Sequence, residues 1–398
     1  MTPLPFDAAD PLLARVAWSR IIEPPDADAA ALLRAVGPSA ALKWLADGAA
    51  DPPGLAPGGG QLAPPGGGLA RARARWLPRL EGLDPRRELR ALAALGGTLL
   101  VPGAPGWPRR LEDLGDAAPI CLWVRAAEGV AGLLDRRLQP AAAVVGARAS
   151  TAYGETVTGQ IVADLVGHGV AVVSGGAFGV DAAAHRMALS CGGFTVAVMA
   201  GGVDRLYPAG NERLLRAVIE QGALVGELPP GAAPRRERFL ARNRLIAALA
   251  AVTVVAESGW RSGSHRTARD AANLLRPVGA VPGPVTAASS AGCHKLIREG
   301  AATLVTGGDE VRELIAAAGQ VALLEPAVAP GPLDGLNQVD RRVFDALPKA
   351  RGAALTAVVV ASGLSTHDAL GALSRLERAG RAAESGGLWR RAGAAWRG

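Results

Sequence analysis

The sequence has few of the residues that mark secreted, metal-binding or membrane proteins. Its 3 cysteines are far apart and form no C-x-x-C pair, so neither a disulfide framework nor a zinc cluster is indicated (Cys121, Cys191 and Cys293). No stretch approaches the roughly 18 uninterrupted apolar residues of a membrane-spanning helix. The first residues, MTPLPFDAADPLLARV, lack a basic region followed by an apolar one. We therefore expect no secretory signal, no membrane contact and a cytoplasmic protein.

Motifs of the common catalytic sites are also missing. The sequence contains no H-E-x-x-H, no close carboxylate pair at metal-ligand spacing, and no nucleophile with an adjacent histidine and acid. Neither the G-x-G-x-x-G fingerprint nor a Walker A motif occurs. We therefore predict a protein that is not an enzyme, with no catalytic residue, no metal and no cofactor.

Charge gives the first positive indication. The formal net charge is +7 and the sequence pI is about 10.1, a balance typical of proteins with an anionic partner, most often nucleic acid. Lysine occurs only at positions 43, 295 and 349, so arginine supplies nearly all the positive charge. Arginine favours bidentate phosphate contacts. The bias towards Ala, Gly, Pro and Arg is also typical of a GC-rich coding sequence, to which we attribute the larger share of the arginine excess.

The 398 residues are too many for one ordinary core, and the 49% hydrophobic and 20% charged fractions exclude disorder over most of the chain. Helical spacing of apolar residues predicts a small N-terminal helical domain, and two Pro/Gly-rich stretches predict linkers. Three C-terminal helices and a hairpin have the plan of a winged helix. The predicted parts are a helical domain (1–50), a linker or insertion (51–68), a core with a lead-in helix over about Leu69–Leu95 (69–320), a linker (321–335) and a winged helix (336–398).

Short apolar runs alternate with helical segments in the core. AAAVVG (141–146), VAVVS (170–174) and TVAVMA (195–200) each precede a predicted helix, and LVGEL, AVTVVAE and GAVPG continue the series. Apolar strands joined by helical crossovers indicate a mostly parallel sheet that is covered on both faces. We predict a doubly wound α/β fold whose site lies in the loops at the carboxyl ends of the strands.

The segment SGGAFGVDAAAH, from Ser174 to His185, follows a predicted strand and opens a predicted helix. Its glycines allow a ligand to approach the backbone, and the helix N-terminus offers N–H groups and a positive dipole end to an anion. We interpret it as a phosphate-binding loop, with a ligand-free tight turn as the alternative. Asp181 is expected to cap the helix, and His185 is expected to be a packed imidazole rather than a base.

Two further segments carry cations towards the same edge. Arg148 follows the first core strand in VVGARAS, where a guanidinium could hold a second phosphate oxygen. In PRRERFLARNRLIAAL five arginines surround Phe239, a pattern suited to single-stranded nucleic acid; the alternative is a solvated basic helix with Phe239 in the core. The loop RSGSHRTA (261–268) is a weaker candidate for the same pocket.

These blocks resemble the DNA-processing protein A family, also called DprA or Smf. VVGARASTAYG, SGGAFGVDAAAH, TVAVMAGGVDRLYPAGN, GELPPG, FLARNRLIA, SGSHRTA and AVPGPVTAASSAGCHKLIREGA occur in the family's order and spacing, over about residues 95 to 310. The resemblance implies a Rossmann-like core, a homodimer formed through that core, and no enzymatic activity. It also implies binding of single-stranded DNA without strong sequence preference, and loading of the RecA recombinase onto it during DNA uptake in natural transformation.

The same resemblance implies the site residues. Arg148 and the loop Ser174–Gly179 should hold DNA phosphates, Phe239 should contact a base, and Asn243 should order its loop by hydrogen bonding. The full set of implied DNA-binding residues is Arg148, Ser174, Gly175, Gly176, Ala177, Gly179, Arg236, Phe239, Arg242, Asn243 and Arg244. Many members read SGSLITA where this chain reads SGSHRTA, so no role is assigned to His265 or Arg266.

Two other functions are alternatives. A regulator could sense a nucleotide in the core and read duplex DNA with the winged helix, although the third helix of that module, DALGALSRLERAG, offers few base-contacting residues. A nucleotide phosphoribohydrolase-like enzyme would resemble a family with a PGGxGT motif followed by Glu. Here the loop reads SGGAFGVD, with no following Glu, which makes this the weakest alternative.

Overall fold

The computed structural model describes residues 4–47, 52, 68–317, 336–348 and 352–392, and it divides into two compact units, Met1–Leu323 and Leu324–Gly398. Both predicted linkers, 51–68 and 321–335, fall outside the described residues apart from Pro52 and Gly68. None of the described helices is long and apolar enough to cross a membrane.

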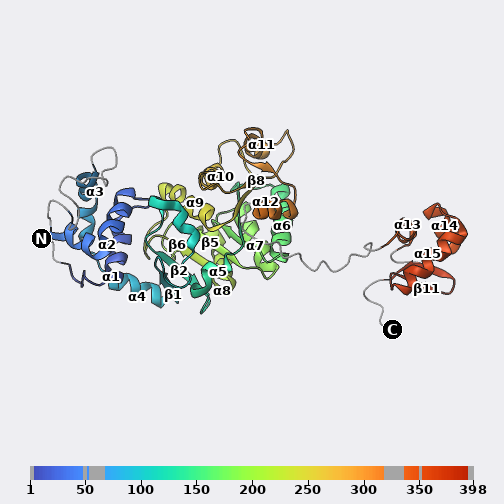
Figure 1. Cartoon of the computed structure of the whole chain (residues 1–398), viewed down its shortest axis with the longest axis horizontal. Helices are drawn as coiled ribbons and strands as arrows, with labels where there is room; N and C mark the ends of the chain where they lie inside the picture. The colour runs from blue at the N-terminus through green and yellow to red at the C-terminus, as the bar shows by residue number, and fades with distance from the viewer. Residues whose placement is uncertain (1–3, 48–51, 53–67, 318–335, 349–351, 393–398) are drawn as a thin grey trace. The chain divides into compact units, whose positions relative to one another are not determined.

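A nine-stranded sheet forms the centre of the first unit (Figure 1). Its strand order is β1-β2-β6-β5-β4-β3-β7-β8-β9; the pairs from β6 to β9 are parallel, whereas β1 and β2 pair antiparallel at one edge. The strands are β1 (Gly97–Leu100), β2 (Leu122–Ala126), β3 (Ala141–Gly146), β4 (Ala171–Ser174), β5 (Thr195–Met199), β6 (Ala223–Gly226), β7 (Val252–Glu257), β8 (Val278–Ala280) and β9 (Thr303–Leu304). The mixed α/β class and the mostly parallel sheet are therefore confirmed.

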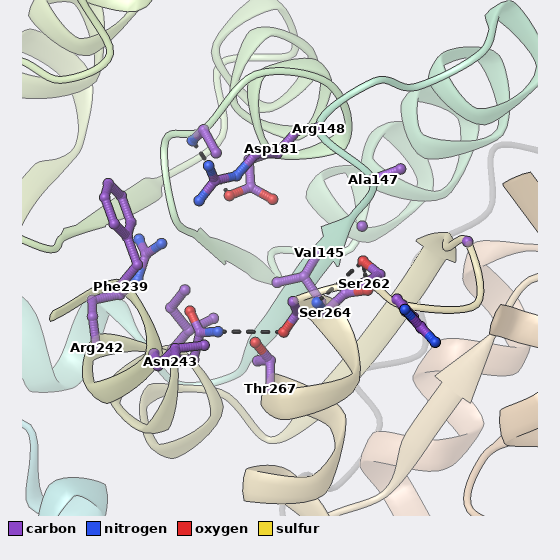
Figure 2. Close-up of a pocket in the computed structure, with 17 residues that line it drawn as sticks. Val145, Ala147, Arg148, Asp181, Phe239, Arg242, Asn243, Ser262, Ser264 and Thr267 are labelled. Atoms are coloured by element: carbon purple, nitrogen blue, oxygen red, sulfur yellow. Dashed lines mark hydrogen bonds between the residues drawn. The ribbon is translucent and has the colours of Figure 1, made fainter. Parts of the chain in front are cut away.

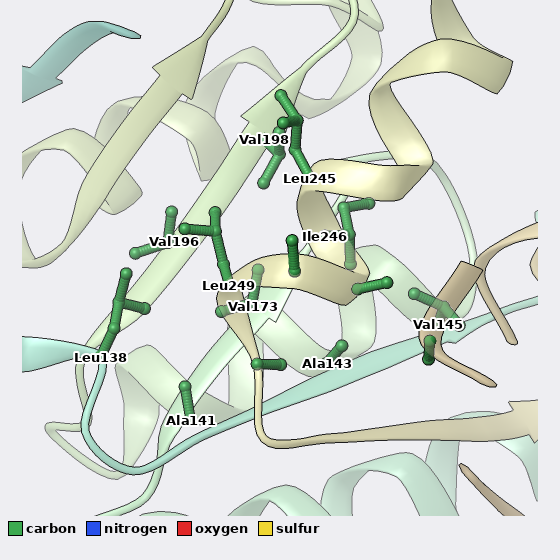
Figure 3. Close-up of a cluster of buried hydrophobic side chains, with 14 of the residues drawn as sticks. Leu138, Ala141, Ala143, Val145, Val173, Val196, Val198, Leu245, Ile246 and Leu249 are labelled. Atoms are coloured by element: carbon green, nitrogen blue, oxygen red, sulfur yellow. The ribbon is translucent and has the colours of Figure 1, made fainter. Parts of the chain in front are cut away.

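Helices cover both faces of this sheet, which explains why its strands are apolar throughout. The helices of the core are η2 (Arg109–Ala117), η3 (Ala131–Leu133), α5 (Leu134–Arg137), α6 (Ala152–Gly167), α7 (Val180–Ser190), η4 (Ala209–Asn211), α8 (Glu212–Gln221), α9 (Arg236–Leu249), α10 (Ser264–Asn273), η5 (Ala288–Ser290), α11 (Ala291–Arg298) and α12 (Gly308–Ala317). Side chains of β3 alternate between the faces: Ala141, Ala143 and Val145 face α9 (Figure 3), and Ala142 and Val144 pack with residues of α6 and α7.

The N-terminal helices form a second hydrophobic core. They are α1 (Pro11–Ile21), α2 (Ala27–Asp47), α3 (Gly68–Trp76), η1 (Leu77–Leu80) and α4 (Pro85–Ala94). Trp18 and Trp76 pack edge to face, with ring centroids 5.1 Å apart. Leu69–Leu95 was expected to form one helix of the core domain. Instead it is broken near Gly82, which has a φ of +69°, and it packs with α1 and α2.

The second unit has its own small core, which includes Phe344, Leu373 and Leu376. It contains α13 (Gln338–Ala346), β10 (Ala353–Ala354), α14 (Leu355–Ser362), α15 (Thr366–Arg378), β11 (Ala382–Ser385) and β12 (Leu388–Arg391). The three strands pair antiparallel in the order β10-β12-β11. The assignment of this unit as a winged helix stays a prediction.

Candidate nucleic-acid interface

A pocket of about 390 Å³ opens at the carboxyl ends of the parallel strands, where a doubly wound sheet carries its ligand site (Figure 2). The residue after β3, the loop after β4, the helix α9 and the loop after β7 contribute its walls. The lining includes Arg148, Ala177, Phe239, Arg242, Asn243 and Arg261. Segments separated by more than 100 residues therefore meet in one depression.

The glycine loop between β4 and α7 is shaped by an internal acid. Gly176 and Gly179 have φ values of +68° and +75°, which other residues rarely adopt. The buried Asp181 carboxylate accepts hydrogen bonds from the N–H groups of Gly175, at 3.1 Å, and Ala177, at 3.3 Å. Two of the N–H groups that were expected to face a phosphate are thus already occupied. Burial raises the pKa of Asp181, and the nearby Arg242 guanidinium opposes that rise.

Arg242 lies beneath this loop rather than in solvent. Its guanidinium is buried and donates to the carbonyl oxygens of Gly175, at 2.8 Å, and Val198. Burial lowers the pKa of Arg242 to about 10. Arg242 lines the pocket, but its guanidinium donors are engaged by the glycine loop and β5, which they support from below.

Arg148 and Phe239 form the exposed part of the pocket. Arg148 is exposed, and its guanidinium carbon lies 5.1 Å from the centroid of the Phe239 ring. No ion-pair partner for Arg148 occurs among the described residues. Phe239 is half-buried and also lies 5.8 Å, between ring centroids, from Tyr207. The two residues that were expected to contact phosphate and base are therefore adjacent and accessible.

Three other candidates lie elsewhere. The Ser174 hydroxyl is buried and donates to the Val144 carbonyl oxygen at 2.7 Å, so it faces the sheet and not the pocket. Arg244 is buried against Glu227, with a nitrogen–oxygen distance of 2.7 Å, and its predicted place in the groove is wrong. Arg236 is exposed at the start of α9 and does not line the pocket.

The loop after β7 contributes more residues to the pocket than the sequence indicated. Arg261 lines the pocket, and Asn243 donates to the Gly263 carbonyl oxygen at 3.4 Å, which connects α9 to this loop. Arg266 instead pairs with Asp270 on its own helix, at 2.9 Å. Burial, with the charge of Lys295, lowers the pKa of His265.

Sequence reasoning missed Asn211 altogether. Its side-chain amide donates to the carbonyl oxygens of Gly176 and Ala177, both at 3.0 Å, and so holds the glycine loop from the β5–α8 connection. The only signal was its position after a Pro-containing turn, YPAGN, which is a general feature of helix starts. No group of three or more His, Cys, Asp or Glu side chains in the described part of the chain could hold a metal ion.

Comparison with known proteins gives consistent matches. The family model described as DNA recombination-mediator protein A matches residues 98–316. The chain is 44% identical, over 395 residues and 95% of each chain, to a protein of Mycobacterium tuberculosis called "Putative DNA processing protein DprA". It is 40% identical over 205 residues to the DNA processing protein DprA of Streptococcus pneumoniae, covering 52% of this chain and 70% of that one. An X-ray structure of DprA from that organism matches with a TM-score of 0.54 and 34% identity, covering 61% of this chain and 81% of that chain.

Proposed function

Because this chain belongs to the DNA recombination-mediator protein A family, we propose that it binds single-stranded DNA in the pocket between Arg148 and Arg261 and loads RecA recombinase onto that strand. The observation that carries the proposal is the exposed Arg148 guanidinium, 5.1 Å from the Phe239 ring centroid. A cation can hold a phosphate while the accessible aromatic ring beside it stacks on the base of the same nucleotide.

The chemistry of the pocket favours a single strand over a duplex. A ring can stack only on a base whose face is free, and bases in a duplex are already stacked on their neighbours. Stacking is available to every base, so the binding should tolerate sequence. The remaining polar groups, from the glycine loop and the β7–α10 loop, suit backbone contacts that carry no sequence information.

A binding role also fits the acid in the pocket. One oxygen of the Asp181 carboxylate, Oδ2, accepts two loop N–H groups, and the carboxylate lies near the buried Arg242, so this acid stabilises the loop. We propose that the chain acts without catalysis, in the cytoplasm, as a homodimer formed through the core, and serves DNA uptake and recombination. The Arg244–Glu227 pair then has a structural role only.

The test is fluorescence anisotropy with labelled single-stranded and duplex oligonucleotides across a salt series. We expect a preference for the single strand, an affinity that falls with salt, and weaker binding by Arg148→Ala. Binding that is insensitive to salt would overturn the proposal. Tighter binding to duplex that is lost on deleting residues after 335 would instead support the regulator. RecA loading is tested separately, by the rate of filament formation on strands coated with a single-strand binding protein.

A further inference from the structure

Exposed aromatic side chains gather at one edge of the sheet. Within the described residues, four aromatic side chains are more than two-fifths exposed: Tyr153 (42%), Phe178 (48%), Tyr207 (48%) and Trp260 (54%). They follow strands β3, β4, β5 and β7 respectively, which are consecutive in the sheet order β5-β4-β3-β7. Single exposed aromatics are common, but four on adjacent strand ends are a concentrated apolar feature. With neighbouring strands about 4.8 Å apart, the four strand ends span roughly 14 Å.

Not all four are equally free to contact a ligand. The Tyr153 hydroxyl donates to the Pro282 carbonyl oxygen at 2.5 Å, which ties that ring to its neighbourhood. Phe178 lies against Gly210, where an added Cβ would come within 2.9 Å of the ring. Tyr207 already neighbours Phe239 on the side of the pocket described above. Trp260 is the most exposed of the four, and it has no aromatic neighbour among the described residues.

Trp260 has the same kind of neighbour as Phe239. The flanking residues Gly259 and Arg261 line the pocket, whereas Trp260 itself does not, so the tryptophan adjoins the pocket without forming its wall. The Lys295 ammonium nitrogen, on α11, lies 5.1 Å from the centroid of a Trp260 ring. An aromatic ring with a cation beside it therefore occurs both in the pocket, as Phe239 with Arg148, and next to it, as Trp260 with Lys295.

We propose that Trp260 is a second base-stacking platform, and that the bound strand crosses the pocket from Phe239 past Arg261 to reach it. Lys295 then contacts the phosphate next to the stacked base, as Arg148 does at the first ring. This inference rests on the proposed function, because it concerns the path of the same single strand. It extends the footprint beyond the pocket, along the edge from the end of β4 to the loop after β7.

Intrinsic fluorescence tests the contact directly. Five of the 8 tryptophans are buried in the first unit, Trp389 lies half-buried in the second, Trp260 is exposed, and Trp396 lies outside the described residues (the five are Trp18, Trp44, Trp76, Trp107 and Trp123). A stacked base quenches a tryptophan, so unlabelled oligo(dT) should quench the wild-type protein. Trp260→Phe should lose most of that quenching while keeping a stacking ring, and the matched control Trp389→Phe should retain it.

Affinity measurements give the second readout. Loss of one stacked base corresponds to about 1–3 kcal/mol, so Trp260→Ala should bind a labelled 20-nucleotide oligo(dT) about tenfold more weakly. Leu275→Ala, which changes a side chain that is 94% exposed, is the control and should bind like the wild type. Lys295→Ala should reduce the log–log salt slope by about 0.7.

The outcomes separate the two proposals. If the wild type does not bind single-stranded DNA, the proposed function fails. If the wild type binds, but Trp260→Ala has wild-type affinity and Trp260→Phe is still quenched, only the second platform is overturned. A loss of affinity in Trp260→Ala accompanied by a changed sedimentation coefficient would also overturn it, because Trp260 would then belong to a contact between copies of the chain.

Discussion

The Arg242 guanidinium lies directly against the backbone of Gly175, to whose carbonyl oxygen it donates at 2.8 Å. A Cβ on Gly175 would lie 2.4 Å from an Arg242 nitrogen, so the glycine makes room for the cation. The glycine loop and the helix α9 are therefore built against each other. An arginine that the sequence indicates as a ligand contact is instead the support of the loop that shapes the site.

This relationship predicts opposite phenotypes for two arginines of one pocket. Arg242→Ala leaves the Asp181 carboxylate buried without its cation and the Gly175 carbonyl without its donor, so we expect unfolding free energy to fall by about 3–5 kcal/mol. The measurement is urea denaturation followed by circular dichroism. Arg148→Ala, at an exposed position, is the matched control and should unfold like the wild type. Equal stability of both variants would contradict the supporting role of Arg242.

Arg148 should contribute one phosphate contact to the electrostatic part of binding. Removing a cation that neutralises one phosphate reduces the log–log salt slope for a single strand by about 0.7. We expect this decrease in Arg148→Ala, and Arg148→Lys should restore most of the slope, because the charge is kept. The slope is obtained from anisotropy titrations between about 50 and 200 mM salt. A variant with the wild-type slope would place the phosphate elsewhere.

Loss of the buried Arg244–Glu227 pair should destabilise the protein without changing its affinity for DNA. Both side chains are buried, and the Arg244 guanidinium also donates to the Ala117 carbonyl oxygen at 2.8 Å. Arg244→Ala leaves a buried carboxylate without its cation and should cost about 3–5 kcal/mol. The double variant Glu227→Leu with Arg244→Met should recover part of this loss. Under conditions where each variant is folded, affinity for oligo(dT) should stay at the wild-type value.

The strands of the core were predictable because they are buried on both faces and so read as uninterrupted apolar runs. The run Ala141–Gly146 coincides with β3, and Val180–Ser190 coincides with α7. The antiparallel strands β1 and β2 were not anticipated, since GTLL and LWVRA are short and lie outside any strand–helix alternation. β1 is the edge strand and β2 lies beside it, and neither belongs to the series of apolar runs and helices by which the other strands were recognised.

The loops that form the site could be predicted from the sequence. Which arginines are exposed in it could be predicted less well. Arg148 and Phe239 meet as expected, because strand ends of a parallel sheet share one edge. Arg236 lies at the exposed start of α9, whereas Arg242 and Arg244 lie further along it, where the helix becomes buried. Their burial depends on partners that are distant in the chain, such as Gly175 and Glu227.

His185 predicts how stability depends on pH. The imidazole is buried, as expected, with Nδ1 2.8 Å from the Thr195 hydroxyl oxygen, and burial, reinforced by the charge of Arg242, lowers its pKa to about 3. Below the ordinary value near 6.5 the unfolded chain binds a proton that the folded protein does not, so stability is lost as pH falls from 6.5 towards 3. This single group should contribute about 1.4 kcal/mol per pH unit across most of that range. His185→Gln should remove that contribution, so the wild type should show the steeper loss in urea titrations between pH 6 and about 4; parallel curves would contradict the buried neutral imidazole.

Gly179 places the glycine loop in close contact with the backbone of Ala147 and Arg148. Its φ is +75°, and a Cβ there would lie 2.2 Å from the Ala147 carbonyl oxygen and 2.6 Å from that of Arg148. Gly179→Ala must therefore both strain the loop and push away the segment that carries Arg148, so we expect a loss of about 1–3 kcal/mol in unfolding free energy and weaker binding of oligo(dT) by the folded protein. Gly167→Ala, at the end of α6, is the matched control: nothing lies within 4 Å of its added Cβ, and the helix should be unchanged or stabilised by roughly 0.5–1 kcal/mol. If Gly179→Ala loses stability but keeps wild-type affinity, the strain is confined to the glycine loop, and the position of Arg148 does not depend on it.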